Sequence, residues 1–138
     1  MHQNPEPEEI RRLLSEARTV AVVGLSDRPY RTSHGIARTL QGFGYRIFPV
    51  NPNLGGPVLG EEPYSRVPEI PDDVDIVDVF RRSATLFPVA EDAVAAGAKV
   101  LWMQSGVVNE EAAHAREHGL TVVMDRCIKV DYAYLVGK

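Results

Sequence analysis

The sequence predicts an α/β fold with a five-stranded, mainly parallel sheet covered by helices on both faces. Short apolar runs alternate along the chain with amphipathic segments of helical periodicity. The first run, Val20–Val23, is apolar at every position, as expected of a strand that is buried on both faces. Polar loops follow the strands, whereas glycines mark most of the helix-to-strand connections. These observations place the candidate ligand loops at one end of the sheet.

Alternation of helix and strand begins at the amino terminus. Pro5–Ala17 is expected to be a helix because its isoleucine and leucines fall on one face. The first strand is expected at Thr19–Gly24, and the next helix begins near Ser33, a candidate N-cap. Glycines end that helix before the second strand, Tyr45–Val50. The sequence Asn51-Pro52-Asn53 then predicts a turn.

The middle of the chain is less regular. Leu54–Asp73 is rich in Gly and Pro, so a long helix is not expected there. The third strand is expected at Asp75–Phe80, where Asp78 is an unexpected residue for a buried strand. A helix capped by Arg81-Arg82-Ser83 then runs to about Ala96.

The carboxyl-terminal part repeats the alternation. The fourth strand is expected at Lys99–Met103, followed by a helix that Asn109 caps and Gly119 ends. The fifth strand is expected at Leu120–Met124, and a short helix closes the chain. The predicted fold is of the Rossmann type, with the expected strand order 3-2-1-4-5 and right-handed crossovers.

Composition and charge disfavour nucleic-acid-binding, membrane-spanning and secreted proteins. The 138 residues are 44% hydrophobic and 25% charged, which is typical of one globular domain over residues 1–138. The net charge of −4 disfavours a nucleic-acid surface. No apolar run approaches the roughly 20 residues of a membrane span, and Met1–Glu9 lacks the apolar core of a signal peptide. With a single cysteine, Cys127, the chain forms no internal disulfide, and we expect a cytoplasmic protein.

Every loop that follows a predicted strand contains residues suited to holding a ligand. In an open parallel sheet, ligands bind beyond the carboxyl ends of the strands, where the strand order reverses. The loop after the first strand carries serines and arginines just before a helix, which is typical of a phosphate site. The five loops are Gly24–Ser33, Asn51–Asn53, Arg81–Ser83, Gln104–Gly106 and Asp125–Ile128.

The first loop departs from the known dinucleotide and triphosphate patterns. A dinucleotide site would read G-x-G-x-x-G, with an acidic residue ending the second strand. Here the second glycine is absent after Gly24, and the ribose-binding position is the neutral Asn51. The G-x-x-x-x-G-K-[ST] pattern is also absent. The residues favour an adenine nucleotide with several separated phosphates over NAD or FAD.

Four segments, in this order, resemble the stand-alone CoA-binding protein family. They read VAVVGLSDRPYRTSHGIARTLQGFGYRIFPVNPN, DIVDVFRR, GAKVLWMQSGVVNEEAA and VVMDRCIKVD. The family is similar to the amino-terminal, CoA-binding domain of the succinyl-CoA synthetase α-subunit, and the resemblance covers roughly Glu8–Asp131. It implies a Rossmann fold that binds coenzyme A along the strand ends. The synthetase has its phosphohistidine in a second domain, so the resemblance does not imply ligase activity.

The resemblance also implies which residues contact the ligand. Phosphate groups would lie against Gly24, Ser26, Asp27, Arg28 and Ser33. The adenine or ribose would lie against Val50, Asn51 and Pro52. The middle of the site would be formed by Phe80, Arg81 and Arg82, and the pantetheine side by Gln104, Ser105 and Gly106.

Three functions remain open from the sequence. The first, which we favour, is a CoA- or acyl-CoA-binding module with no catalytic residue and no metal. The second is an enzyme that acts on a CoA thioester or disulfide through Cys127 or His34. The third is an NAD(P)-binding redox sensor. The sequence gives no indication of a protein partner, and the histidine pair His114 and His118 is interpreted as surface residues.

Overall fold

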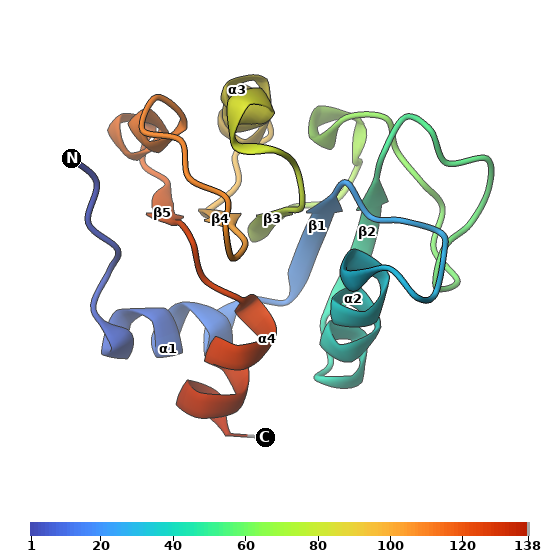
Figure 1. The fold of residues 1–138 in the computed structure, drawn as a ribbon, viewed down its shortest axis with the longest axis horizontal. Coiled ribbons are helices and arrows are strands. Elements are labelled where there is room, and N and C mark those ends of the chain that lie inside the picture. Colours follow the sequence, from blue (N-terminus) through green and yellow to red (C-terminus); the bar gives the residue numbers. More distant parts are fainter. Residues whose placement is uncertain (138) are drawn as a thin grey trace.

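The computed structural model describes residues 1–137, and five parallel strands form its central sheet (Figure 1). Every strand pairs with its neighbours in parallel, in the order β2-β1-β3-β4-β5. The predicted α/β class is therefore confirmed. The strands are β1 (Thr19–Val23), β2 (Arg46–Val50), β3 (Ile76–Val79), β4 (Val100–Met103) and β5 (Thr121–Val123).

Helical segments cover both faces of the sheet (Figure 1). The α-helices are α1 (Pro7–Glu16), α2 (Thr32–Gly42), α3 (Leu86–Ala95) and α4 (Ile128–Asp131). The shorter turns are η1 (Val67–Glu69), η2 (Ser83–Thr85) and η3 (Ala112–His118), all 3₁₀, and the π-helical η4 (Tyr132–Val136). We call the side covered by α1, α2, α4 and η4 the α2 face, and the side covered by η1, α3 and η3 the α3 face.

The helical layers on both faces of the sheet explain why the strands are apolar at nearly every position. Val20 and Val22 of β1 point to the α2 face, whereas Ala21 and Val23 point to the α3 face. All four are at most 4% exposed. Because successive side chains of a strand alternate between faces, a strand buried on both faces must be apolar at every position.

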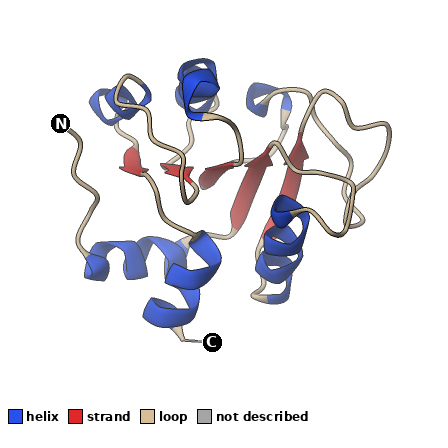
Figure 2. Ribbon diagram, in the orientation of Figure 1, coloured by secondary structure: helices blue, strands red, loops and turns tan. Residues whose placement is uncertain are grey.

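The predicted strand order 3-2-1-4-5 is wrong. β3 pairs with β1, and the outer edge of β2 is occupied by Tyr64, whose N–H donates to the Pro49 carbonyl at 2.9 Å. Right-handed crossovers that run in opposite directions along a sheet lie on opposite faces. α2 joins β1 to β2 on the α2 face, and η1 joins β2 to β3 on the α3 face. Figure 2 shows the connection from β2 to β3 as mostly loop. Because a loop has no helical periodicity, the face of the sheet on which it crosses could not be predicted from the sequence.

Two helix predictions need correction. The N-cap of α2 is Arg31 rather than Ser33, which lies inside the first turn. The helix expected between Asn109 and Gly119 is present as the 3₁₀ segment η3, and the Asn109 side chain does accept the Ala112 N–H at 2.9 Å. Within residues 1–137, no helix is long and apolar enough to cross a membrane.

The amino-terminal segment runs beside β5 (Figure 1). The Asn4 side-chain amide donates to the Met124 carbonyl at 2.9 Å and accepts the Met124 N–H at the same distance. One side chain thus satisfies both backbone groups of the residue that follows β5.

Candidate ligand-binding site

The strand order reverses between β1 and β3. From β1 the chain moves to β2 on one side, and from β3 it continues to β4 and β5 on the other. In α/β sheets, this reversal is where ligands bind. A cavity of about 350 Å³ lies there, lined by Gly24, Ser26, Tyr30, Arg31, Thr32, Ser33 and Phe80. The structure therefore brings together four of the predicted site residues, from two strand ends.

Gly24 lies in the tightest part of this site. Its φ is +87°, in the region that favours glycine. A Cβ at this position would lie 2.4 Å from the Phe80 carbonyl oxygen. The Gly24 N–H donates to the Val50 carbonyl at 2.8 Å, so the ends of β1, β2 and β3 meet around this residue.

Hydrogen bonds fasten the loop after β1 to the first turn of α2. The Ser26 N–H donates to Ser33 Oγ at 3.0 Å, and the Arg28 N–H donates to Ser26 Oγ at 3.1 Å. His34 Nδ1 lies 2.9 Å from the Ser26 carbonyl oxygen, and because a carbonyl only accepts, Nδ1 carries the proton. Ser33 therefore organises the loop rather than capping the helix.

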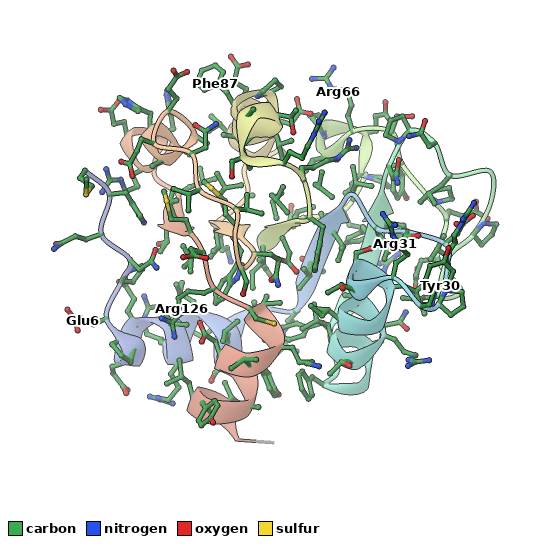
Figure 3. All side chains as sticks on the ribbon, viewed as in Figure 1. Glu6, Tyr30, Arg31, Arg66, Phe87 and Arg126 are labelled. Atoms are coloured by element: carbon green, nitrogen blue, oxygen red, sulfur yellow. The ribbon has the colours of Figure 1, made fainter. Side chains whose placement is uncertain are left out.

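Cationic groups lie at the mouth of the cavity. Arg28 and Arg31 are exposed, and Arg28 Nη1 donates to the Tyr30 hydroxyl at 3.0 Å. Figure 3 shows Tyr30 and Arg31 on the loop above α2. The amino terminus of α2 adds free backbone N–H groups and the positive end of the helix dipole. These groups are suited to an anionic ligand.

The two arginines after β3 have different surroundings. The Arg81 Cδ would lie 3.5 Å from a Cβ on Gly24, so this side chain packs beside the loop after β1. Arg81 Nε is buried and has no hydrogen-bond partner among residues 1–137. Arg82 is exposed. Arg81 thus offers an unused donor next to the cavity.

The predicted residues at the end of β2 lie beside the cavity without lining it. Val50 is buried, and Pro52 is exposed. The Asn51 side-chain amide donates to the Leu25 carbonyl at 3.1 Å and accepts the Asn53 N–H at 3.0 Å. Asn51 therefore holds the loop after β1 against the end of β2.

The predicted residues at the end of β4 lie further along the same edge, outside the cavity. The Gln104 side-chain oxygen accepts the Ile128 N–H at 3.1 Å, which fixes the start of α4. Ser105 and Gly106 are exposed, and the Gly106 N–H donates to the Asp125 carboxylate at 2.7 Å. Cys127 is partly buried and packs on the α2 face.

Asp78 is the residue that the sequence singled out as unexpected in a strand. It is 0% exposed, and neither carboxyl oxygen has a hydrogen-bond partner among residues 1–137. Burial raises its pKa well above the ordinary value, because the charged form loses hydration without gaining a partner.

Tyr30, Arg31 and Thr32 also line the cavity; Arg31 and Thr32 belong to the loop whose polar residues predict a phosphate site, whereas no sequence signal pointed to Tyr30. All three fall in the predicted polar loop Gly24–Ser33. For Arg31 and Thr32, the position just before a helix N-terminus was the available indication. For the histidine pair, His114 Nδ1 lies 3.6 Å from the Glu117 carboxylate on the exposed side of η3.

Comparison with known proteins adds independent information. A family model described as a CoA binding domain matches residues 18–133. The chain is 49% identical over 132 residues to the uncharacterized protein YneT of Bacillus subtilis, covering 95% of this chain and 97% of the relative.

Solved structures agree with this match. A hypothetical protein from Pyrococcus horikoshii superposes with a TM-score of 0.92 at 34% identity, covering 99% of this chain and 100% of its own. A dinucleotide-forming acetyl-coenzyme A synthetase of Ca. Korarchaeum cryptofilum, solved with phosphate and ADP, superposes with a TM-score of 0.71 at 26% identity. That match covers 84% of this chain but only 27% of the synthetase chain.

Proposed function

This chain belongs to the CoA-binding domain family, and from that premise we propose that it binds coenzyme A or an acyl-CoA across the carboxyl ends of β1 to β4. The observation that carries the proposal is the cavity at the reversal of strand order, where serines, exposed arginines and a helix N-terminus surround Gly24. Its donors suit a polyanion. The similarity to part of an acetyl-coenzyme A synthetase supports the same ligand.

We propose that the phosphate groups lie in this cavity. Ser26 and the α2 N-terminus would donate hydrogen bonds there, and Arg28 and Arg31 would supply charge at its mouth. The unpartnered Nε of Arg81 would donate to a ligand oxygen from the β3 side. The adenosine would extend toward Asn51 and the pantetheine arm toward Gln104, along the same edge of the sheet.

Calorimetric titration with CoA, acetyl-CoA, ATP and NADH tests the proposal. We expect CoA or acetyl-CoA to bind more tightly than ATP, and NADH to show no specific binding. Binding of NADH without binding of CoA would overturn the proposal in favour of a dinucleotide sensor.

Arg28→Ala is expected to weaken CoA binding about two- to fivefold at low salt, because it removes an exposed charge near the phosphates. The loss should shrink as salt rises, since ions screen exposed charges. The control is Arg12→Ala, because Arg12 pairs with Glu16 on α1, away from the cavity. Calorimetry at two salt concentrations measures the CoA affinity of both variants. An Arg28→Ala affinity equal to that of the unmodified protein at low salt would remove Arg28 from the site.

We also propose that the chain binds its ligand without transforming it. His34 is only 8% exposed, and neither His34 nor Cys127 lines the cavity at the reversal of strand order. Incubation with acetyl-CoA should therefore release free thiol no faster than buffer does. Release that is lost in Cys127→Ser or His34→Ala would contradict this and identify an enzyme.

A further inference from the structure

Asp78 differs from two other carboxylates of the chain, the buried Asp131 and the partly buried Asp75. Asp131, 4% exposed, accepts two hydrogen bonds from Arg126, at 2.6 and 2.8 Å. Asp75, at the start of the same region of chain, accepts the Arg18 N–H at 2.7 Å and faces Lys99. Asp78 has neither an ion pair nor a hydrogen bond among residues 1–137. A buried polar group without a partner destabilises a fold, so its presence calls for another explanation.

Its position relates it to the candidate site. In register, Asp78 lies between Val22 of β1 and Trp102 of β4. Because side chains alternate along a strand, Asp78 and Phe80 point to the same face, and Phe80 packs on the α2 face. Phe80 also lines the cavity. Asp78 is therefore one pleat, about 6–7 Å along the strand, below the floor of the site.

The sheet order places this residue beneath the middle of the proposed ligand. A molecule that extends from the loop after β1 to Gln104 at the end of β4 must cross β3, which lies between them. It would cross at Phe80, which is only partly buried. A turn of the Phe80 ring is the movement that would open a path from the ligand to Asp78.

We propose that the carboxyl group of Asp78 hydrogen-bonds an amide of the pantetheine arm of bound CoA, with Phe80 as its cover in the unliganded protein. This inference rests on the proposed function. It assigns to Asp78 a role in recognising the uncharged part of the ligand.

The chemistry of a buried carboxyl group favours the pantetheine arm over the phosphates as the partner of Asp78. A protonated carboxyl group has one donor and one good acceptor, and a secondary amide of the arm has the same complement. A carboxyl group next to a phosphate would be repelled whenever it ionised, whereas the cavity near α2 already supplies serines and an arginine for phosphates. A buried polar pair made only with the correct ligand also gives specificity, because an analogue without the amide leaves Asp78 unpaired.

The test compares two probes, CoA and adenosine 3′,5′-bisphosphate, which lacks the pantetheine arm. Asp78→Val is expected to lower the affinity for CoA about tenfold and to leave the affinity for the bisphosphate unchanged. Asp78→Asn keeps a donor and an acceptor in the same place, so it should retain CoA binding within about threefold. Asp75→Asn is the control, because it makes the same side-chain change just before β3, at the end of the strand away from the site.

Calorimetry on the full chain separates the possible failures. If the unmodified protein binds neither probe, the proposed function itself fails. If it binds CoA and Asp78→Val binds CoA equally well, or loses both probes alike, the role of Asp78 is overturned. Thermal melting of each variant without ligand confirms that the compared proteins are folded.

Trp102 provides a second readout. It is the only tryptophan of the chain, is 0% exposed and pairs with Asp78 across the sheet. We expect CoA to change its fluorescence in the unmodified protein, and the bisphosphate to leave it unchanged. An equal change with both probes would contradict a contact between the arm and Asp78.

Discussion

Replacing Gly24 with alanine is expected to lower the free energy of unfolding by roughly 2–5 kcal/mol and to abolish measurable CoA binding. Roughly 1–2 kcal/mol comes from a positive φ, here +87°, that alanine rarely adopts. A further roughly 1–3 kcal/mol comes from the methyl group, which would lie 2.4 Å from the Phe80 carbonyl oxygen. That contact is with backbone, so relief requires β1 and β3 to move apart at the site. Urea denaturation and calorimetry measure the two losses.

Gly42→Ala is the matched control. Gly42 lies at the end of α2, and a Cβ there would meet nothing within 4 Å. In a helix, alanine is favoured over glycine by about 1 kcal/mol, so this variant should be slightly stabilised and should bind CoA normally. If Gly24→Ala binds CoA as well as Gly42→Ala does, the strand ends around Gly24 do not form the site.

Asp78→Val is expected to raise the free energy of unfolding at neutral pH by about 1–3 kcal/mol. The substitution removes a carboxyl group that is 0% exposed and unpartnered within residues 1–137, and places a β-branched side chain in a central strand. Urea denaturation of the unliganded protein is the measurement. A variant that both gains stability and loses CoA affinity would mark Asp78 as a residue kept for binding at the expense of the fold.

The pH dependence of stability provides an independent check. Burial raises the pKa of Asp78 in the folded protein, so the folded state keeps a proton that the unfolded chain releases above about pH 4. In this pH range the unfolded state binds fewer protons than the folded state. The free energy of unfolding therefore falls as the pH rises from the unfolded to the folded pKa of Asp78, by about 1.4 kcal/mol per pH unit. Asp78→Asn should lack this part of the slope. Parallel stability curves for the two proteins between pH 5 and pH 8 would show that Asp78 is partnered in solution.

The sequence was sufficient for the class of the fold and for the edge of the sheet at which the polar loops lie. Short, valine-rich runs such as Val20–Val23 favour strands with cover on both faces, and the loops that follow parallel strands share one edge of the sheet. The strand order was not accessible in the same way. It depends on the face on which the η1 segment crosses, and the Gly- and Pro-rich sequence from Leu54 to Asp73 has no helical periodicity to indicate a face.

Individual side chains were predicted less well than their loops. Arg81 and Arg82 are equivalent in the sequence, and only the approach of β1 to β3 distinguishes the side chain that packs by Gly24 from the exposed one. Ser33 was predicted to be the N-cap of α2, but the N-cap is Arg31. The Ser33 hydroxyl instead accepts the Ser26 N–H, because the loop after β1 bends back to the first turn of the helix. Such contacts follow from tertiary packing.

The paired amide of Asn4 has a consequence for how the protein behaves at high concentration. A sheet edge with unpaired backbone groups is a template on which another chain can add a strand, and such additions lead to aggregation. Asn4 occupies both backbone groups of Met124 beyond β5, and Tyr64 bonds to Pro49 and Asn51 on the outer side of β2. Proteolytic loss of the first four residues would therefore free both backbone groups of Met124 beside β5, and we expect the trimmed chain to self-associate more readily.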